Sequence, residues 1–267
     1  MKLDTTISRK AQKLEYWISK RVGRAMGDFN MLSGGDRILV CVSGGKDSLT
    51  LLKVLVSRQL KVPIKHEIVV LHAVSSQSCG EDNAKKRLRD IFERLGVEYY
   101  FAPMQIELQD RKKKQGLNCF WCSWNRKKIF FEWARKLNCN KIALGHHKDD
   151  IVETTLMNLF FQGEFSTMMP NQPFFKGKFR IIRPLCYVEE VLIAEYAGEA
   201  GFIANNCICP FGENSNRKRI KEFLQQTEKT CPGVKNNIFY APGRINEEYL
   251  PFMKSQGHKD ARSQGRG

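Results

Sequence analysis

The sequence predicts an α/β fold in which a doubly wound parallel sheet of about five strands carries helices on both faces. Short apolar runs, of which 38–42 is the clearest, are typical of strands buried on both sides. A helical pattern follows most of these runs, so strands and helices alternate along the chain. The run 38–42 also ends in a glycine turn that opens directly into a helix. Alternation of this kind predicts parallel strands, whose carboxyl ends form one ligand-binding edge.

The expected elements follow in chain order. An amphipathic helix at 7–27 comes first, and it either packs on the main domain or presents basic residues to RNA; its apolar face holds Leu14, Trp17, Ile18 and Val22. Strands are expected at 38–42, 67–73, 97–101, 141–145 and 179–182. Further helices are expected through Leu49, Leu52, Leu55 and Val56, and at 81–95, 122–137, 149–161 and 188–200. Residues 103–118 and 163–177 are expected to be connections, and the chain from about residue 205 departs from the alternation.

The chain is strongly basic, with 44 Lys and Arg against 28 Asp and Glu and a net charge of +16. The excess gathers in runs at 111–114, 126–128, 217–219 and 254–266. Such a field favours a polyanionic partner, nucleic acid above all, although a generally basic surface is the alternative. No run of 18 apolar residues occurs and the N-terminus lacks an apolar signal core, so we expect a cytoplasmic protein that has no membrane span.

The glycine turn at Ser43–Ser48 predicts a phosphate site. Backbone N–H groups between a buried strand and a helix start form a concave nest at the positive end of the helix dipole. Gly44 and Gly45 let the backbone approach a ligand, Lys46 adds a point charge, and Ser48 or Asp47 is available to cap the helix. The loop is shorter than the common nucleotide loop and suits a compact pyrophosphate. The alternative is an ordinary strand, turn and helix.

Other residues are expected along the same sheet edge. Ser43 follows a predicted buried strand, and Ala73 and Gly145 end two others, so all three would lie along this edge and one ATP could contact them, with its adenine near the backbone after Leu71. Asp149 and Asp150 follow Gly145 at a helix start and could hold Mg²⁺ on a pyrophosphate. Zinc binding by His146 and His147, or carboxylates that merely favour the helix N-terminus, are the alternatives.

The cysteines form a second candidate site. Cys119 and Cys122 make a C-x-x-C pair before a helix, and Cys207 and Cys209 follow much later. A four-thiolate zinc site, an iron–sulfur cluster on three cysteines, and a redox pair of Cys119 with Cys122 all fit this pattern. The other cysteines have no clustered partner and are expected to be buried thiols: Cys41, Cys79, Cys139, Cys186 and Cys231.

Taken together, these motifs resemble the tRNA 2-thiocytidine synthetase family, within the PP-loop ATP pyrophosphatases that thiolate tRNA. The resemblance covers about 38–224 and follows a fixed order of motifs, which are S-G-G-K-D-S at 43–48, C-x-x-C at 119–122, G-H-H-K-D-D at 145–150, I-R-P-L at 182–185 and N-S-N-R at 214–217. It implies a PP-loop fold and an enzyme that uses ATP, Mg²⁺ and an oxygen-sensitive [4Fe–4S] cluster.

The resemblance also implies residue roles. Cys119 and Cys122 map onto two cluster ligands, and Cys209 onto the third, with Cys207 held in reserve because the spacing departs from the family pattern. Arg126 maps onto a phosphate contact and Asp150 onto the acidic residue of the ATP site, while Lys46 and Asp47 belong to the catalytic loop. The terminal zinc-binding pairs of the T-loop thiolases are absent from this sequence, which argues against that group.

On this reading the chain has three parts: a basic N-terminal helix at 1–36, a PP-loop ATP-binding domain with an inserted C-x-x-C helix at 37–204, and a C-terminal extension with the third cysteine and a basic tail at 205–267. The implied reaction is 2-thiolation of a tRNA base, cytidine 32 of the anticodon loop. The implied partners are tRNA, a cysteine desulfurase or free sulfide as sulfur donor, and a second copy in a homodimer. The alternatives are another PP-loop thiolase or ligase with zinc or no metal, and a tRNA-binding protein without catalysis.

Overall fold

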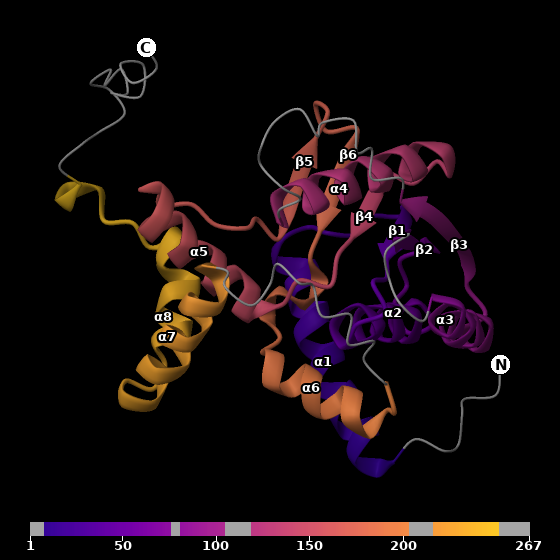
Figure 1. Cartoon of the computed structure of the whole chain (residues 1–267), viewed down its shortest axis with the longest axis horizontal. Coiled ribbons are helices and arrows are strands. Elements are labelled where there is room, and N and C mark those ends of the chain that lie inside the picture. The colour runs from indigo at the N-terminus through magenta and orange to yellow at the C-terminus, as the bar shows by residue number, and fades with distance from the viewer. Residues whose placement is uncertain (1–7, 76–80, 105–118, 203–215, 251–267) are drawn as a thin grey trace.

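A six-stranded sheet forms the centre of the computed structural model, which describes residues 8–75, 81–104, 119–202 and 216–250, without the side chains at 75, 81, 82, 104 and 119–123 (Figure 1). The strands lie in the order β3-β2-β1-β4-β6-β5. Their bounds are Arg37–Cys41 for β1, Glu67–Ser75 for β2, Glu98–Met104 for β3, Lys141–Ala143 for β4, Asn171–Phe174 for β5 and Phe179–Ile182 for β6. All neighbours are parallel except β5 and β6, so the predicted α/β class is confirmed.

The helices cover both faces of this sheet, as predicted. Their bounds are Arg9–Asp28 for α1, Lys46–Gln59 for α2, Glu81–Leu95 for α3, Cys119–Lys136 for α4, Lys148–Gln162 for α5, Glu190–Glu199 for α6, Asn216–Thr230 for α7 and Val234–Tyr240 for α8. A hydrophobic core lies on each face of the sheet. Successive side chains of β1 point to opposite faces, so this strand contributes to both cores. Ile38 and Val40 pack with α1, α2 and α6, whereas Leu39 and Cys41 pack with Phe130 of α4.

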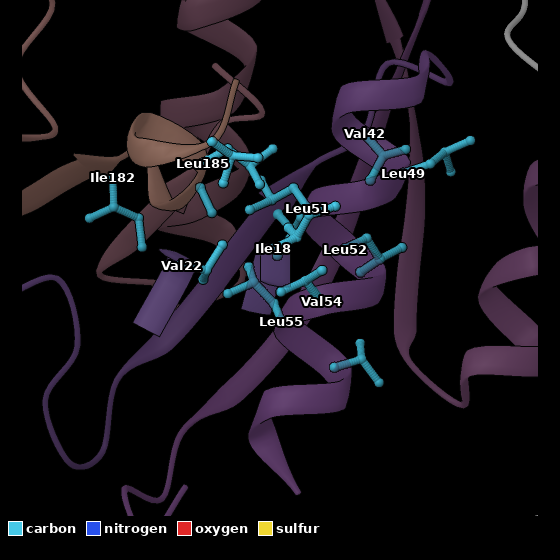
Figure 2. Packing of buried hydrophobic residues seen from close by; sticks show 14 of the residues in the cluster. Ile18, Val22, Val42, Leu49, Leu51, Leu52, Val54, Leu55, Ile182 and Leu185 are labelled. Atoms are coloured by element: carbon cyan, nitrogen blue, oxygen red, sulfur yellow. The ribbon is translucent and has the colours of Figure 1, made fainter. Parts of the chain in front are cut away.

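The N-terminal helix α1 packs on the main domain, which was one of its two predicted roles. Ile18 and Val22 are fully buried, and Figure 2 shows Ile18 beside Leu51 and Leu55 of α2. The predicted apolar face is wrong at one position, because Trp17 is 43% exposed. The buried stripe runs instead through Ala11, Ile18, Val22 and Ala25, at helical spacing.

One expected connection contains a strand. The segment 163–177 includes β5, which pairs antiparallel with β6 at the edge of the sheet. Its four residues include Pro173, which has no N–H to donate, so only an edge position suits it. A strand of four residues with a proline is too short to show an alternating hydrophobic pattern, which is why the sequence does not reveal it.

Residues 216–250 form a helical unit on α5. Ile220 and Leu224 of α7 are buried against Val152 and Leu156 of α5. In Figure 1, α5, α7 and α8 lie together to the left of the sheet. The predicted departure from strand–helix alternation is confirmed for 216–250, while the boundaries at 36/37 and 204/205 stay predictions. No helix in the described ranges is both long and apolar enough to cross a membrane.

Candidate functional site

The candidate site lies where the strand order reverses. From β1 the chain continues to β2 and β3 on one side, whereas β4 pairs with β1 on the other side. The loops after β1 and β4 therefore leave the same sheet edge as neighbours. A crevice at this position is the usual ligand site of an open α/β sheet.

The loop after β1 is held by Ser48 in the first turn of α2. The Ser48 hydroxyl donates to the Gly45 carbonyl at 2.9 Å and accepts from the Ser43 amide at 3.1 Å. Gly44 has a φ of +89°, a backbone conformation that favours glycine. The buried Ser48 hydroxyl thus fixes the curve of the loop from within, and the turn predicted at Ser43–Ser48 is present.

The predicted side-chain cap of α2 is wrong. Gly45 is the N-cap residue and no side chain caps this end of the helix. Ser48 is committed to the loop interior, and Asp47 contacts Lys46 instead. An N-terminus without a side-chain cap leaves its first amides available for an external anion, which suits a phosphate.

Lys46 lies between two carboxylates. Its Nζ is 3.1 Å from Asp47 Oδ1 and 3.2 Å from Glu190 Oε1 at the start of α6. Burial lowers the pKa of Lys46, but these two carboxylates outweigh burial and leave the pKa above its ordinary value. Lys46 is therefore a fixed positive charge at neutral pH.

Gly145 brings the loop after β4 against the loop after β1. A Cβ at this position would lie 3.0 Å from the Ser48 amide nitrogen and 3.1 Å from the Asp47 carbonyl carbon. Both neighbours are backbone atoms, so no side-chain rotation would relieve the clash. The tight strand exit predicted at Gly145 thus has a physical cause, which is contact with the first turn of α2.

The helix α5 begins at this contact. His147 is its N-cap and forms a capping box with Asp150, whose Oδ2 accepts from the His147 amide at 2.9 Å. His147 Nε2 also lies 3.9 Å from Asp47 Oδ1. The structure therefore places Asp150 next to the glycine loop, together with Lys46, Asp47 and Gly145.

The predicted acidic pair serves two separate contacts. Asp149 accepts from the Glu190 amide and from Lys235 Nζ of α8, each at 2.7 Å. Asp150 pairs with Arg217 of α7, whose Nε also donates to Glu153 at 2.7 Å. The two carboxylates thus tie α5 to α6, α7 and α8, which the sequence alone does not indicate.

The alternative zinc site at the two histidines has no support. The described ranges hold no group of three His, Cys, Asp or Glu side chains arranged for a metal ion. Burial lowers the pKa of His146 to about 4, so this ring is neutral at physiological pH. His147 is engaged as the N-cap of α5.

The adenine side of the predicted site lies on β2. Ala73 is inside β2, paired with Ala102 of β3, because the strand continues to Ser75 and does not end at residue 73 as predicted. The part of β2 that pairs with β1 ends at Leu71, and the Val42 amide donates to the Leu71 carbonyl at 2.9 Å. Ala73 therefore lies just beyond the last β1 pairing, beside the glycine loop.

The cysteine site is only partly within the described residues. Cys119 and Cys122 lie in the first turn of α4, and Cys207 and Cys209 fall outside the described ranges. Burial raises the pKa of the Cys41 thiol, which ends β1, and the exposed Arg126 of α4 opposes that rise through its charge. Phe130 of α4 packs in one hydrophobic cluster with Leu39 and Cys41, so α4 lies over β1 on this face of the sheet.

The remaining cysteines are mostly buried, as predicted. Cys41, Cys139 and Cys186 are buried and free. Cys231 contradicts the prediction, because it is exposed after the end of α7, and Cys79 lies outside the described residues.

Two of the four predicted basic runs fall within the described residues. The run 126–128 is exposed on α4, and the run 217–219 lies in the first turn of α7.

Asp149→Asn is expected to destabilise the fold at neutral pH by about 1–3 kcal/mol, because the partly buried Lys235 ammonium loses its ionic partner. Burial raises the pKa of Asp149, but Lys235 and the Glu190 amide outweigh burial and hold the pKa below its ordinary 3.8. The carboxylate thus stabilises the fold above that pH, and its contribution is lost as pH falls through the lowered pKa. Urea unfolding from pH 7 to pH 3 should show the two proteins converging; a constant difference would contradict this.

Comparison with known proteins agrees with this geometry. The model of the PP-loop domain matches residues 14–204. The tRNA-cytidine(32) 2-sulfurtransferase of Ralstonia pickettii is 38% identical over 248 residues, which are 92% of this chain and 78% of the relative. The tRNA-cytidine(32) 2-sulfurtransferase of Shewanella pealeana is 37% identical over 262 residues, covering 95% of this chain and 83% of the relative.

A solved structure shows the same fold. The U34-tRNA thiolase NcsA from Methanococcus maripaludis, a protein with a [4Fe–4S] cluster, superposes with a TM-score of 0.71 at 20% identity, covering 88% of this chain and 79% of that one. At that identity the likeness concerns the fold. With a PP-loop domain over most of its length and relatives above 35% identity along more than nine-tenths of it, the chain belongs to the PP-loop tRNA-cytidine(32) 2-sulfurtransferase family.

Proposed function

We propose that this chain is an ATP- and [4Fe–4S]-dependent sulfurtransferase that adenylates cytidine 32 of tRNA and replaces its 2-oxo oxygen with sulfur. The observation that supports this most directly is the glycine loop at the β1–β4 switch point, held against Gly145 and carrying Lys46 at an α2 N-terminus without a side-chain cap. The activity named for relatives 36–38% identical to the chain supplies the reaction.

The chemistry assigned to the loop follows from charge. In adenylation the 2-oxo oxygen attacks the α-phosphorus of ATP, and the bond to the leaving pyrophosphate breaks. Negative charge grows on that leaving group, and preorganised N–H donors together with Lys46 stabilise it. The hydrogen bonds of Ser48 fix the curve of the loop before ATP arrives. Mg²⁺ would be held by phosphate oxygens with a carboxylate from Asp47 or Asp150.

The cluster would be held by Cys119, Cys122 and Cys209. Cys119 and Cys122 are three residues apart in the first turn of α4, so they lie on the same side of the helix, at the end whose dipole favours thiolates. A [4Fe–4S] cluster bound by three cysteines has one iron without a protein ligand. That iron would be available to carry the sulfide that the reaction needs. The protein's part would be to bring this helix start to the ATP edge, and the packing of Phe130 of α4 against Cys41 at the end of β1 supports that placement.

Nucleoside mass spectrometry of tRNA from cells lacking the gene tests the proposed function. Loss of 2-thiocytidine, restored by the wild-type chain, is the expected result. Loss of a different thionucleoside would assign another substrate, and an unchanged profile would leave only tRNA binding. The proposal further includes a cytoplasmic location, a cysteine desulfurase or free sulfide as sulfur donor, and a homodimer.

Cys209→Ala is expected to abolish cluster assembly while leaving ATP affinity within about twofold, because the thiolates and the phosphate loop are separate sites. Iron and acid-labile sulfide would be measured after anaerobic purification, with ATP affinity by calorimetry. Cys207→Ala is the matched control and should keep the cluster. If Cys207→Ala loses the cluster and Cys209→Ala keeps it, the third ligand is Cys207.

A further inference from the structure

We propose that Glu190 is a positioning residue for Lys46, and that Lys221 of α7 sets how strongly Glu190 holds this lysine. The inference rests on the proposed function, because it assigns Lys46 to the phosphates of ATP. Glu190 lies 144 residues from Lys46 in sequence, and no motif contains it. Only the tertiary structure brings the two side chains together.

The Glu190 carboxylate lies between the ammonium groups of Lys46 and Lys221. Glu190 Oε1 accepts from Lys46 Nζ at 3.2 Å, and Glu190 Oε2 accepts from Lys221 Nζ at 2.7 Å. The Glu190 side chain is 25% exposed and that of Lys46 is 28% exposed. Charges that are partly removed from water attract each other more strongly than charges on an open surface. One carboxylate is therefore shared between the catalytic loop and the C-terminal helices.

The helices that carry Glu190 and Lys221 are both anchored on α5. The Glu190 amide donates to Asp149 Oδ2, which fixes the first turn of α6 against α5. On the other side, Arg217 bonds Asp150 and Glu153 of α5, one helical turn before Lys221. Because the backbone is held at both ends, the position of the Glu190 carboxylate is set by the fold as well as by the two lysines.

ATP changes the balance of these contacts. Its phosphates compete with Glu190 for the Lys46 ammonium, so binding must weaken the Lys46–Glu190 contact. Lys221 lowers the cost of that exchange, because Glu190 keeps a cation when Lys46 turns to the ligand. Since α7 begins at Asn216, close in sequence to Cys209, the helix that follows the proposed cluster ligand also bears on the phosphate site.

Kinetics of the anaerobically purified full chain test this inference, with pyrophosphate release measured in the presence of ATP, tRNA and sulfide. Glu190→Gln should lower the KM for ATP about threefold, because Lys46 is released, and lower kcat about tenfold, because its orientation is lost. Lys221→Met should instead raise the KM for ATP about threefold. Without Lys221, Lys46 is the remaining lysine partner of Glu190, so Glu190 holds Lys46 more tightly against competition from the phosphates. In the Glu190→Gln background, Lys221→Met should change nothing further, as expected for coupled residues.

Two variants serve as controls. Lys229→Met removes the same charge from an exposed position near the end of α7 and should leave both constants unchanged. Glu190→Asp keeps the carboxylate and should recover most of kcat. An effect of Lys221→Met that is equal in both backgrounds, or a Glu190→Gln enzyme with unchanged constants, overturns the inference. Absence of pyrophosphate release by the wild type would instead refute the proposed function, and calorimetric ATP affinities of the same variants would still decide the role of Glu190.

Discussion

Lys46→Ala is expected to slow tRNA-dependent pyrophosphate release by about 10²–10³-fold, the usual effect of removing one group that stabilises transition-state charge. Lys46 follows the N-cap of α2, and its ammonium stays charged because Asp47 and Glu190 hold its pKa above the ordinary value. The charge is thus available at the site where pyrophosphate would leave. Loss of the side chain removes that charge without touching the loop hydrogen bonds of Ser48.

The measurement is single-turnover pyrophosphate release from the anaerobic enzyme, with iron and sulfide content determined on the same samples. Cluster content should not change, since Lys46 lies on α2 and the proposed ligands lie elsewhere. Lys61→Ala removes an exposed lysine just beyond α2 and is the matched control. Unchanged turnover in Lys46→Ala would remove the glycine loop from the mechanism.

Gly145→Ala is expected to weaken ATP binding at least tenfold and to destabilise the fold by about 1–3 kcal/mol, the usual cost of forcing atoms into a packed site. The added Cβ would meet the backbone of Asp47 and Ser48 at 3.0–3.1 Å, so the loops after β1 and β4 must move apart. That movement would displace the loop amides that we propose to bind the phosphates. The φ of Gly145 is not in the left-handed region, so steric contact alone causes the effect.

Calorimetric ATP titration and thermal unfolding would measure both parts of this result. Gly198→Ala is the control, because a Cβ there meets no atom within 4 Å and alanine favours the helix α6. This variant should bind ATP normally and unfold at the same or a slightly higher temperature. Normal ATP affinity in Gly145→Ala would show that the two loops need not touch for phosphate binding.

Much of the fold is predictable from local sequence pattern. The wrong predictions have one cause in common, which is that each depends on contacts that the local sequence does not show. The strand at 38–42 and its helix are visible because apolar runs and a glycine turn coincide. The edge strand β5 is missed because a four-residue segment with two polar residues and a proline has no strand pattern of its own and forms a strand only by pairing with β6. The cap of α2 is predicted wrongly because the sequence cannot show that Ser48 turns into the loop. Trp17 is wrongly predicted on the apolar face of α1, because the helical pattern of the sequence does not show which side chains the rest of the fold buries.

The sequence by itself determined the strand–helix alternation, the glycine loop at Ser43–Ser48 and the family motifs, because each depends on residues close together in the chain. Only the tertiary structure decided that Gly145 touches the first turn of α2, that Asp149 and Asp150 serve different partners, and that Glu190 joins Lys46 to Lys221. These contacts join segments far apart in the chain. They arise because the crossovers of a parallel sheet bring the ends of β1 and β4 together, and because burial of Ile220 and Leu224 docks α7 on α5.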